Sequence, residues 1–295
     1  MGTSYPAPVP DARTLSRPAT DDGDGDEGSP RPLRPLTTRI PFGWVLEIAG
    51  GAIVYTAYSQ IREHVTGSGL LAFHHALDIV GVERFFGIFQ EGPLQRALLS
   101  ERWFISLNNI YYGTIHFLMP LLALSLLYLK MPARYVRWRN TFVIMLGLGV
   151  LTFWLYPLMP PRLMPARFGF VDTAAAFNNL GPRVNVTLGP GFTPSARTLS
   201  VYGNLFAAMP SFHVAWSTWS ALALWPVVRR RWLKVLLVAY PITIVFCVTV
   251  TGNHWFLDAV GGWACVVAAY GLAVLVEVAR TAWFARRAGA AALAT

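Results

Sequence analysis

His254 and Asp258 stand four residues apart at the start of a long apolar run, a spacing that places both side chains on one face of a helix. A carboxylate there accepts one imidazole N–H, which fixes the tautomer and raises the basicity of the other ring nitrogen. That nitrogen is able to attack phosphorus and form a covalent phosphohistidine. His213, which follows Pro210-Ser211-Phe212, is the candidate that protonates the leaving oxygen.

Three other residues are candidates for binding the phosphate group. Arg162, in Pro160-Pro161-Arg162, would clamp two phosphate oxygens and offset negative charge in the transition state. Ser211 would supply a hydroxyl and helix-start N–H groups to the same anion. Arg167 lies in the long connection that follows, and because long loops often act as lids, it is a candidate for a contact with substrate.

Each of these residues also has a structural explanation when it is taken alone. A histidine at a membrane interface satisfies its polar tip in water, an arginine anchors a helix end, and a serine caps a helix. His116, inside an apolar run, is expected to form a hydrogen bond between helices, the alternative being that it faces the same cavity as the other histidines. The whole group points to chemistry, because ionisable side chains are costly inside a membrane bundle and mark functional sites there.

The composition predicts a membrane protein. Of the 295 residues, 54% are hydrophobic and only 13% are charged, and the mean hydropathy is +0.44, whereas globular proteins carry about 25% charged residues. The net charge of +9 comes mostly from basic residues between apolar runs, where they set membrane orientation, so we expect no nucleic-acid partner. Cys247 and Cys265 lie inside apolar runs and are expected to be small hydrophobic side chains.

The elements that must position the candidate residues are apolar helices. A span needs roughly 20 mostly apolar residues, and six runs qualify, at about 42–61, 104–129, 141–159, 205–227, 233–252 and 256–278. The predicted fold is therefore an all-α membrane protein, a six-transmembrane-helix bundle. Residues 69–99 are apolar but too charged to span, which predicts an amphipathic helix or helix pair in the interface.

The chain divides into three parts. Residues 1–38 are rich in Pro, Asp, Gly and Ser and are expected to be a disordered tail. Residues 39–280 form the predicted six-helix catalytic domain, and residues 281–295 are expected to be a cytoplasmic C-terminal tail.

The basic residues predict the orientation of the bundle. They gather before the first run, after the second, after the fourth and after the sixth, which with six spans are all on one side, expected to be cytoplasmic. The other side carries residues 62–103, 253–255 and the long loop 160–204. Arg162, His213 and His254 all stand at helix ends on this non-cytoplasmic side, which predicts one common site.

The motifs resemble those of a known family. Pro210-Ser211-Phe212-His213 and His254-Trp255-Phe256-Leu257-Asp258 resemble the second and third motifs, Pro-Ser-x-His and Ser-Arg-x5-His-x3-Asp, of the type 2 phosphatidic acid phosphatase superfamily. Together with Pro160-Pro161-Arg162, these motifs are similar to those of the inositol phosphorylceramide synthase-like (inositolphosphotransferase) branch. The resemblance covers roughly residues 42–280. It implies a phosphohistidine at His254, orientation by Asp258, leaving-group protonation by His213 and no obligatory metal or other cofactor.

The chain departs from the family pattern at the phosphate site. Leu155 stands where the Lys of the first motif, Lys-x6-Arg-Pro, is expected, and Cys247-Val248 stand where Ser-Arg of the third is expected. The anion site is therefore expected to depend more on Arg162, with Arg167 or another loop arginine.

These observations predict a membrane-embedded phosphotransferase of lipid phosphate esters, with membrane lipids as partners and a polyol or sugar as acceptor. A phosphatase of lipid phosphates or polyprenyl pyrophosphates is the alternative, if water is the acceptor. Two other classes stay open: a haem- or metal-binding membrane protein with the two histidines as ligands, and a transporter or inactive scaffold. We expect a multi-pass protein of a bacterial plasma membrane, since arginine greatly outnumbers lysine. The sequence does not predict an oligomeric state.

Overall fold

The computed structural model describes residues 42–65, 67–177 and 204–292. The predicted disordered tail, residues 1–38, lies outside the described residues, as does the part of the long loop from 178 to 203. All described residues belong to one unit, Pro32–Thr295.

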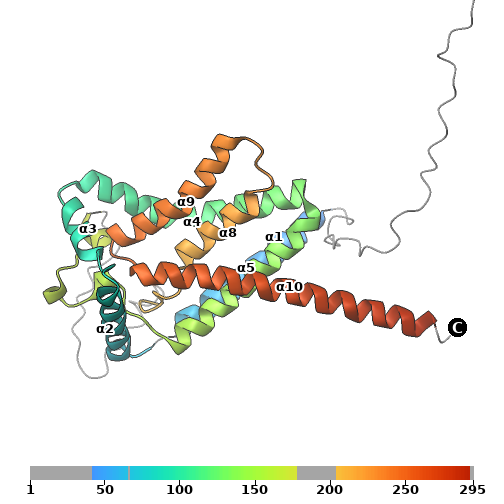
Figure 1. Cartoon of the computed structure of the whole chain (residues 1–295), viewed down its shortest axis with the longest axis horizontal. Helices are drawn as coiled ribbons and strands as arrows, with labels where there is room; N and C mark the ends of the chain where they lie inside the picture. The colour runs from blue at the N-terminus through green and yellow to red at the C-terminus, as the bar shows by residue number, and fades with distance from the viewer. Residues whose placement is uncertain (1–41, 66, 178–203, 293–295) are drawn as a thin grey trace, which may run out of the picture. The chain divides into compact units, whose positions relative to one another are not determined.

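The described residues form helices joined by short connections (Figure 1). The long helices are α1 (Gly43–His64), α4 (Arg102–Lys130), α5 (Pro132–Leu155), α9 (Arg231–Val250) and α10 (Phe256–Ala292). The shorter ones are α2 (Gly69–Phe85), α3 (Glu91–Leu98), α6 (Thr173–Phe177), α8 (Phe212–Leu224) and the 3-10 turns η2 (Pro161–Leu163) and η3 (Ala166–Phe168). The only extended pairing among the described residues is an isolated bridge between Leu158 and Ala207, so the predicted all-α class is confirmed.

The described residues contain four candidate membrane spans, or five if one bent helix pair is counted as a span. Helices α4, α5, α9 and α10 are long and apolar enough to cross a membrane, and α1 and α2, bent by 98°, add a fifth if the pair is one broken span. The predicted six spans are not confirmed. The fourth predicted span contains α8, which is shorter than the roughly 20 residues a crossing needs because Ser211 caps its start and Pro226 follows its end.

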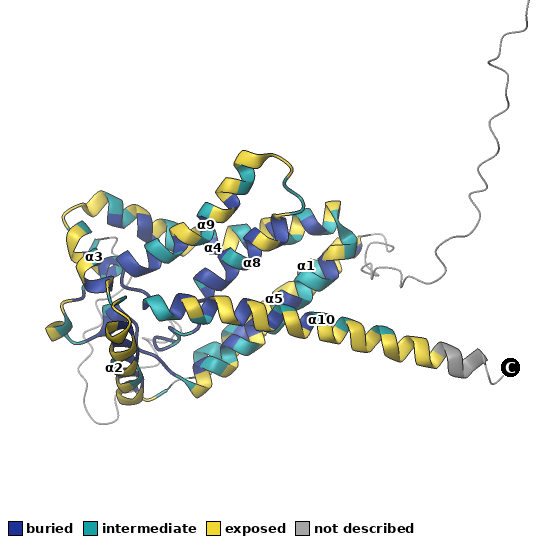
Figure 2. Cartoon of the chain, in the orientation of Figure 1, coloured by how far each residue is buried: buried dark blue, intermediate teal, exposed yellow. Residues whose placement is uncertain are grey.

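The outer faces of the long helices are exposed (Figure 2), and many of the exposed side chains are large and apolar. Leu121 of α4, Val235 of α9 and Val267 of α10 are 62%, 66% and 73% exposed. Water-soluble proteins rarely expose contiguous apolar surface on this scale. The chain is thus a multi-pass integral membrane protein.

Helix α8 lies at the centre of the core and packs against α4, α9 and α10. Nearly all of its side chains are buried, and Trp219 is completely so. Phe212 packs onto α5 at Gly149, where an added Cβ would lie 2.0 Å from the Phe212 ring. The residue that precedes His213 is therefore held against α5 by close packing.

Ion pairs join three helix ends on one side of the core. Arg139 of α5 contacts Glu47 of α1 at 3.0 Å, and Arg137 contacts Glu277 of α10 at 2.7 Å. Tyr135 also donates its hydroxyl to Glu47. These contacts explain the carboxylate inside the apolar first helix, and they place the start of α1, the start of α5 and the C-terminal half of α10 together.

Helices α2 and α3 lie near the opposite side of the core, next to the start of α10. They form the helix pair predicted within residues 69–99, and two of the charged residues of that segment, Glu83 and Glu91, are buried. At the other end of the chain, α10 continues to Ala292, so most of the predicted tail at 281–295 is helix. Its alanines, the strongest helix formers, account for the extension.

Candidate active site

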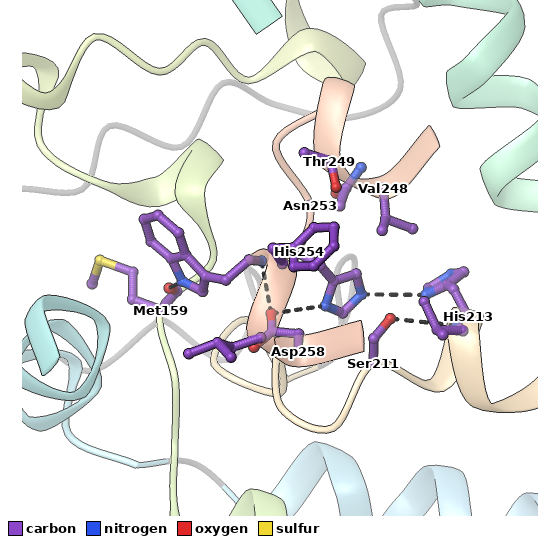
Figure 3. A network of polar contacts seen from close by, with 12 residues as sticks. Met159, Ser211, His213, Val248, Thr249, Asn253, His254 and Asp258 are labelled. Atoms are coloured by element: carbon purple, nitrogen blue, oxygen red, sulfur yellow. Dashed lines mark hydrogen bonds and ion pairs between the residues drawn. The ribbon is translucent and has the colours of Figure 1, made fainter. Parts of the chain in front are cut away.

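His254 lies between Asp258 and His213 (Figure 3). Its Nδ1 is 3.2 Å from Asp258 Oδ2, and its Nε2 is 3.4 Å from His213 Nδ1. Asp258 Oδ2 also accepts the backbone N–H of Trp255 at 2.9 Å, which fixes the carboxylate. With its proton on Nδ1, His254 presents the lone pair of Nε2 on the side of His213. The structure thus brings together the three residues singled out as catalytic candidates.

A tight turn after α9 places His254 ahead of α10. The backbone N–H groups of Asn253 and His254 both donate to the carbonyl of Val248. Gly252 adopts φ +70°, a conformation that other residues rarely take. The predicted contact of His254 with Asp258 is present, but His254 lies in the turn before α10, which begins at Phe256, and only Asp258 is in the helix.

Ser211 connects the two histidine segments through the backbone. Its hydroxyl accepts the N–H of Val214 as the N-cap of α8, and its own N–H donates to the carbonyl of Asp258 at 3.0 Å. The side chain is fully buried and is not among the residues that line the cavity described below. Ser211 therefore positions α8 against α10 in this structure, and its predicted contact with an anion stays a prediction.

Two glycines let α8 and α10 approach each other closely. An added Cβ on Gly262 would lie 2.7 Å from the carbonyl oxygen of Ser211, and one on Gly261 would lie 3.3 Å from Met209. Small residues of this kind allow close backbone contact between membrane helices. The spacing of His213 and His254 depends on this crossing, since His213 is in α8 and His254 lies in the turn just before α10.

Arg162 is fastened directly to the histidine segment. Its backbone N–H donates to the carbonyl of Gly252 at 2.8 Å, and the indole of Trp255 donates to the carbonyl of Met159 at the same distance. The Arg162 guanidinium contacts Asp172 at 3.1 Å. The predicted clamp is therefore beside the histidines, but its charge is partly balanced by a carboxylate.

A cavity of about 120 Å³ opens beside the two histidines. Its polar lining comes from Arg62, Arg162, Asn204, Asn253, His213, His254, Tyr58 and Tyr112. The remaining walls are apolar and come from α5, α8 and the segment 204–208. Two arginines next to two histidines form a site suited to an anion.

Arg62, near the end of α1, is the charged cavity residue that the sequence prediction missed. It forms no ion pair with any described carboxylate, and its buried Nε has no hydrogen-bond partner among the described residues. Its guanidinium lies over the ring of Tyr58 at 5.9 Å. A signal was available, because Arg62 is the first charged residue after the first apolar run, on the side of the bundle that carries the motifs.

His213 packs between aromatic and imidazole rings from α4. Tyr112 stacks on it with ring centroids 3.9 Å apart, and His116 lies 4.3 Å away. Burial, His116, His254 and Arg62 together lower the pKa of His213 well below its ordinary value. The imidazole is therefore neutral until an anion offsets the nearby positive charge.

Two sequence predictions differ from the geometry. His116 bonds to the carbonyl of Tyr112 on its own helix, not to a neighbouring helix, because the ring turns toward His213. Arg167 is exposed and lies over the rings of Phe73 and Phe168, so it is not among the residues lining the cavity.

A family model described as the PAP2 superfamily matches residues 77–272. The chain belongs to the PAP2 superfamily. It is also 26% identical over 158 residues to the inositol phosphorylceramide synthase catalytic subunit aur1 of Schizosaccharomyces pombe. That match covers 51% of this chain and 36% of the yeast protein, so the chain spans little more than a third of its relative. No solved structure matches the chain.

The structure explains how this PAP2 chain accommodates its departures from the motifs. Leu155, in the place of the first-motif Lys, is 63% exposed on the outer surface. Cys247 is buried and its thiol donates to the carbonyl of Asn108. The carbonyl of Val248 accepts the backbone N–H groups of Asn253 and His254 and so holds the turn at His254. None of the three lines the cavity, whereas Arg62 does.

Proposed function

We propose that the chain is a membrane-embedded phosphotransferase of lipid phosphate esters that acts through a phosphohistidine on His254. The observation that carries the proposal is the row Asp258–His254–His213 beside a cavity lined by Arg62 and Arg162. The membership in the PAP2 superfamily supports it.

In the first half-reaction, Nε2 of His254 attacks phosphorus and forms a P–N bond. The bond from phosphorus to the leaving oxygen breaks, its electron pair goes to that oxygen, and His213 supplies the proton. The bound phosphate anion places a negative charge beside His213, which favours the protonated imidazole that this role needs. Asp258 balances the positive charge that develops on His254.

In the second half-reaction, the hydroxyl of an acceptor attacks the phosphorus of the intermediate and passes its proton to His213. The P–N bond breaks and its electron pair returns to Nε2 of His254. The name of the yeast relative favours transfer of an inositol phosphate-type headgroup to an alcohol. With water as acceptor, the same site is a phosphatase of lipid phosphates or polyprenyl pyrophosphates.

The size of the cavity supports a substrate that enters by its phosphate end. Sites that enclose a drug-sized ligand measure roughly 300–1,000 Å³, and this cavity measures about 120 Å³. It accommodates a phosphoryl group and little more, so the acyl or prenyl chains stay outside, among the apolar helix faces and membrane lipids.

We place the site on the non-cytoplasmic face of a bacterial plasma membrane. Arg137 and Arg139 lie at the opposite side of the core from His254, with the start of α1 and the later part of α10. Arginine-rich helix ends are typical of the cytoplasmic face, which supports this orientation.

A haem between the two histidines fits the geometry poorly. Each metal–nitrogen bond measures about 2 Å, so an iron between two imidazoles needs nitrogen atoms about 4 Å apart. The facing nitrogens of His213 and His254 are 3.4 Å apart. Such a ligand set would also give no role to Asp258 or Arg162.

The test uses purified protein with headgroup-labelled phospholipids, including phosphatidylinositol, and with His254→Ala in parallel. Label that appears in a new lipid or polyol, and only with the wild-type protein, supports the transferase. Release of free phosphate or phospho-headgroup alone identifies the hydrolase. Equal turnover in wild type and His254→Ala would overturn the mechanism.

A further inference from the structure

Two buried carboxylates from outside the motifs hold the start of α10. Glu83 of α2 accepts the backbone N–H of Leu257, and Glu91 of α3 accepts that of Phe256, each at 2.8 Å. The first N–H groups of a helix have no partner within the helix, so the two side chains cap α10 from neighbouring helices. Both are almost completely buried, at 0% and 1% exposure.

The two acids form one cluster with Asp258. Their carboxyl groups lie within hydrogen-bonding reach of each other, and Asp258 acts electrostatically on Glu83. Each of the three has one buried oxygen with no donor among the described residues: Glu83 Oε2, Glu91 Oε2 and Asp258 Oδ1. Asp258 is paired with His254, and no other described cation forms an ion pair with Asp258, Glu83 or Glu91.

Three bare carboxylates in one buried cluster would be strongly unfavourable. The helix start favours negative charge by only about 0.3–1 kcal/mol per group, or about 2 in partly buried settings, whereas an unpaired buried ion costs several kcal/mol. No group of His, Cys, Asp and Glu side chains in the described part of the chain is arranged to hold a metal ion. A proton is the counter-charge that the cluster can accept, and two carboxyl groups in contact commonly share one.

We infer that Glu83 and Glu91 share one proton, and that this acid pair is a positioning element which holds the His254–Asp258 dyad in its reactive geometry. The shared proton joins the two Oε2 atoms, while the two Oε1 atoms hold the backbone. The activity assays that test this inference depend on the proposed phosphotransferase function.

The pair acts through the backbone between the two members of the dyad. Phe256 and Leu257 lie between His254 and Asp258, so fixing their N–H groups fixes the first turn of α10. The carbonyl of Asp258 in turn holds Ser211 at the start of α8. Movement of this turn changes both the distance from Asp258 to His254 and the distance from His254 to His213.

Glutamine and alanine substitutions separate the two functions of the pair. In Glu83→Gln or Glu91→Gln, the amide N–H replaces the shared proton while the amide oxygen still accepts the backbone N–H. Either single variant retains most of the wild-type kcat. In the double glutamine variant, two N–H donors face each other, and kcat falls with little change in KM. Glu83→Ala and Glu91→Ala lower kcat by about 10²-fold, the cost of misplacing reacting groups by about 1 Å.

The matched control is Glu101→Gln, an exposed acid that accepts a hydrogen bond from the indole N–H of the exposed Trp103; its kcat equals that of wild type. Thermal unfolding is measured for every variant, and kcat is compared among those that stay folded at the assay temperature. A double glutamine variant as active as the single variants, or alanine variants with wild-type kcat, would overturn the inference.

Infrared spectroscopy tests the proton without any assay of turnover. Wild-type protein at neutral pH shows the carbonyl stretch of a buried protonated carboxyl group, and this band is absent from Glu83→Gln/Glu91→Gln. A band of equal strength in both proteins would overturn the shared proton. If the band behaves as expected but no lipid substrate turns over, the proposed function fails while the acid pair stands.

Discussion

The backbone N–H of Arg162 lies 2.8 Å from the carbonyl oxygen of Gly252, so the segment that carries the predicted phosphate clamp is bonded to the turn that carries the histidine. The two residues are ninety positions apart in sequence. Because the contact uses backbone atoms, it depends on the shape of the turn at Gly252, which only glycine adopts without strain.

Gly252→Ala is expected to lower both stability and turnover. A residue with Cβ at φ +70° costs about 1–2 kcal/mol, and the added Cβ would lie 2.9 Å from Gln95 Nε2. The control is Gly81→Ala, where an added Cβ meets nothing within 4 Å. Thermal unfolding and kcat are measured for both. If Gly252→Ala matches Gly81→Ala in both, the turn does not need its glycine.

Gly262→Ala should lower kcat by separating α8 from α10. Its Cβ would lie 2.7 Å from the carbonyl oxygen of Ser211, which is backbone and cannot swing away, so the two helices must part and His213 must move from His254. Gly271→Ala on the same helix, with open space around its Cβ, is the comparison. A kcat for Gly262→Ala equal to that of Gly271→Ala would rule out this crossing as the determinant of the histidine spacing.

Arg62 and Arg167 should respond differently to substitution by alanine. Hydrogen bonds to charged groups contribute about 1.5–3 kcal/mol, so loss of Arg62 is expected to reduce kcat/KM by about tenfold to 10²-fold. Arg167→Ala is expected to have little effect, since that side chain lies over Phe73 and Phe168. Steady-state kinetics with one lipid substrate decides between them. A larger loss of kcat/KM in Arg167→Ala than in Arg62→Ala would instead assign the anion site to Arg167.

Substitution of the two histidines by alanine should block different steps of the reaction. His254→Ala removes the nucleophile and abolishes turnover and phosphorylation of the protein. His213→Ala abolishes turnover of lipids, yet a substrate whose leaving group needs no proton still phosphorylates His254. Asp258→Asn retains residual activity, because it removes charge and orientation but not the nucleophile. Acid-labile label on His213→Ala protein is the measurement, and label on His254→Ala protein would contradict the assignment.

The local parts of the site could be predicted from sequence. The four-residue spacing predicts the contact of His254 with Asp258, although His254 lies in the turn before α10 and not in the helix, and the burial of α8 follows from its composition. Residue spacing and local composition allow such predictions without tertiary information.

Residues that reach the site over long sequence distances could not be predicted in this way. Arg62 is about 190 residues from His254 and gives no local pattern to link them. Glu83 and Glu91 looked like the polar face of an interfacial helix, because a sequence shows that a residue is charged but not that a helix start nearby lacks partners. The length of α8 was overestimated because apolar residues on both sides of it belong to connections.

The small size of the cavity has a consequence for selectivity. Among the described residues, a site that encloses little more than a phosphoryl group makes no contact with the chains of a lipid substrate. Lipids that differ in chain length or saturation should then react at similar rates once they are in the bilayer. The composition of the surrounding membrane, and not the protein, would decide which of them are used.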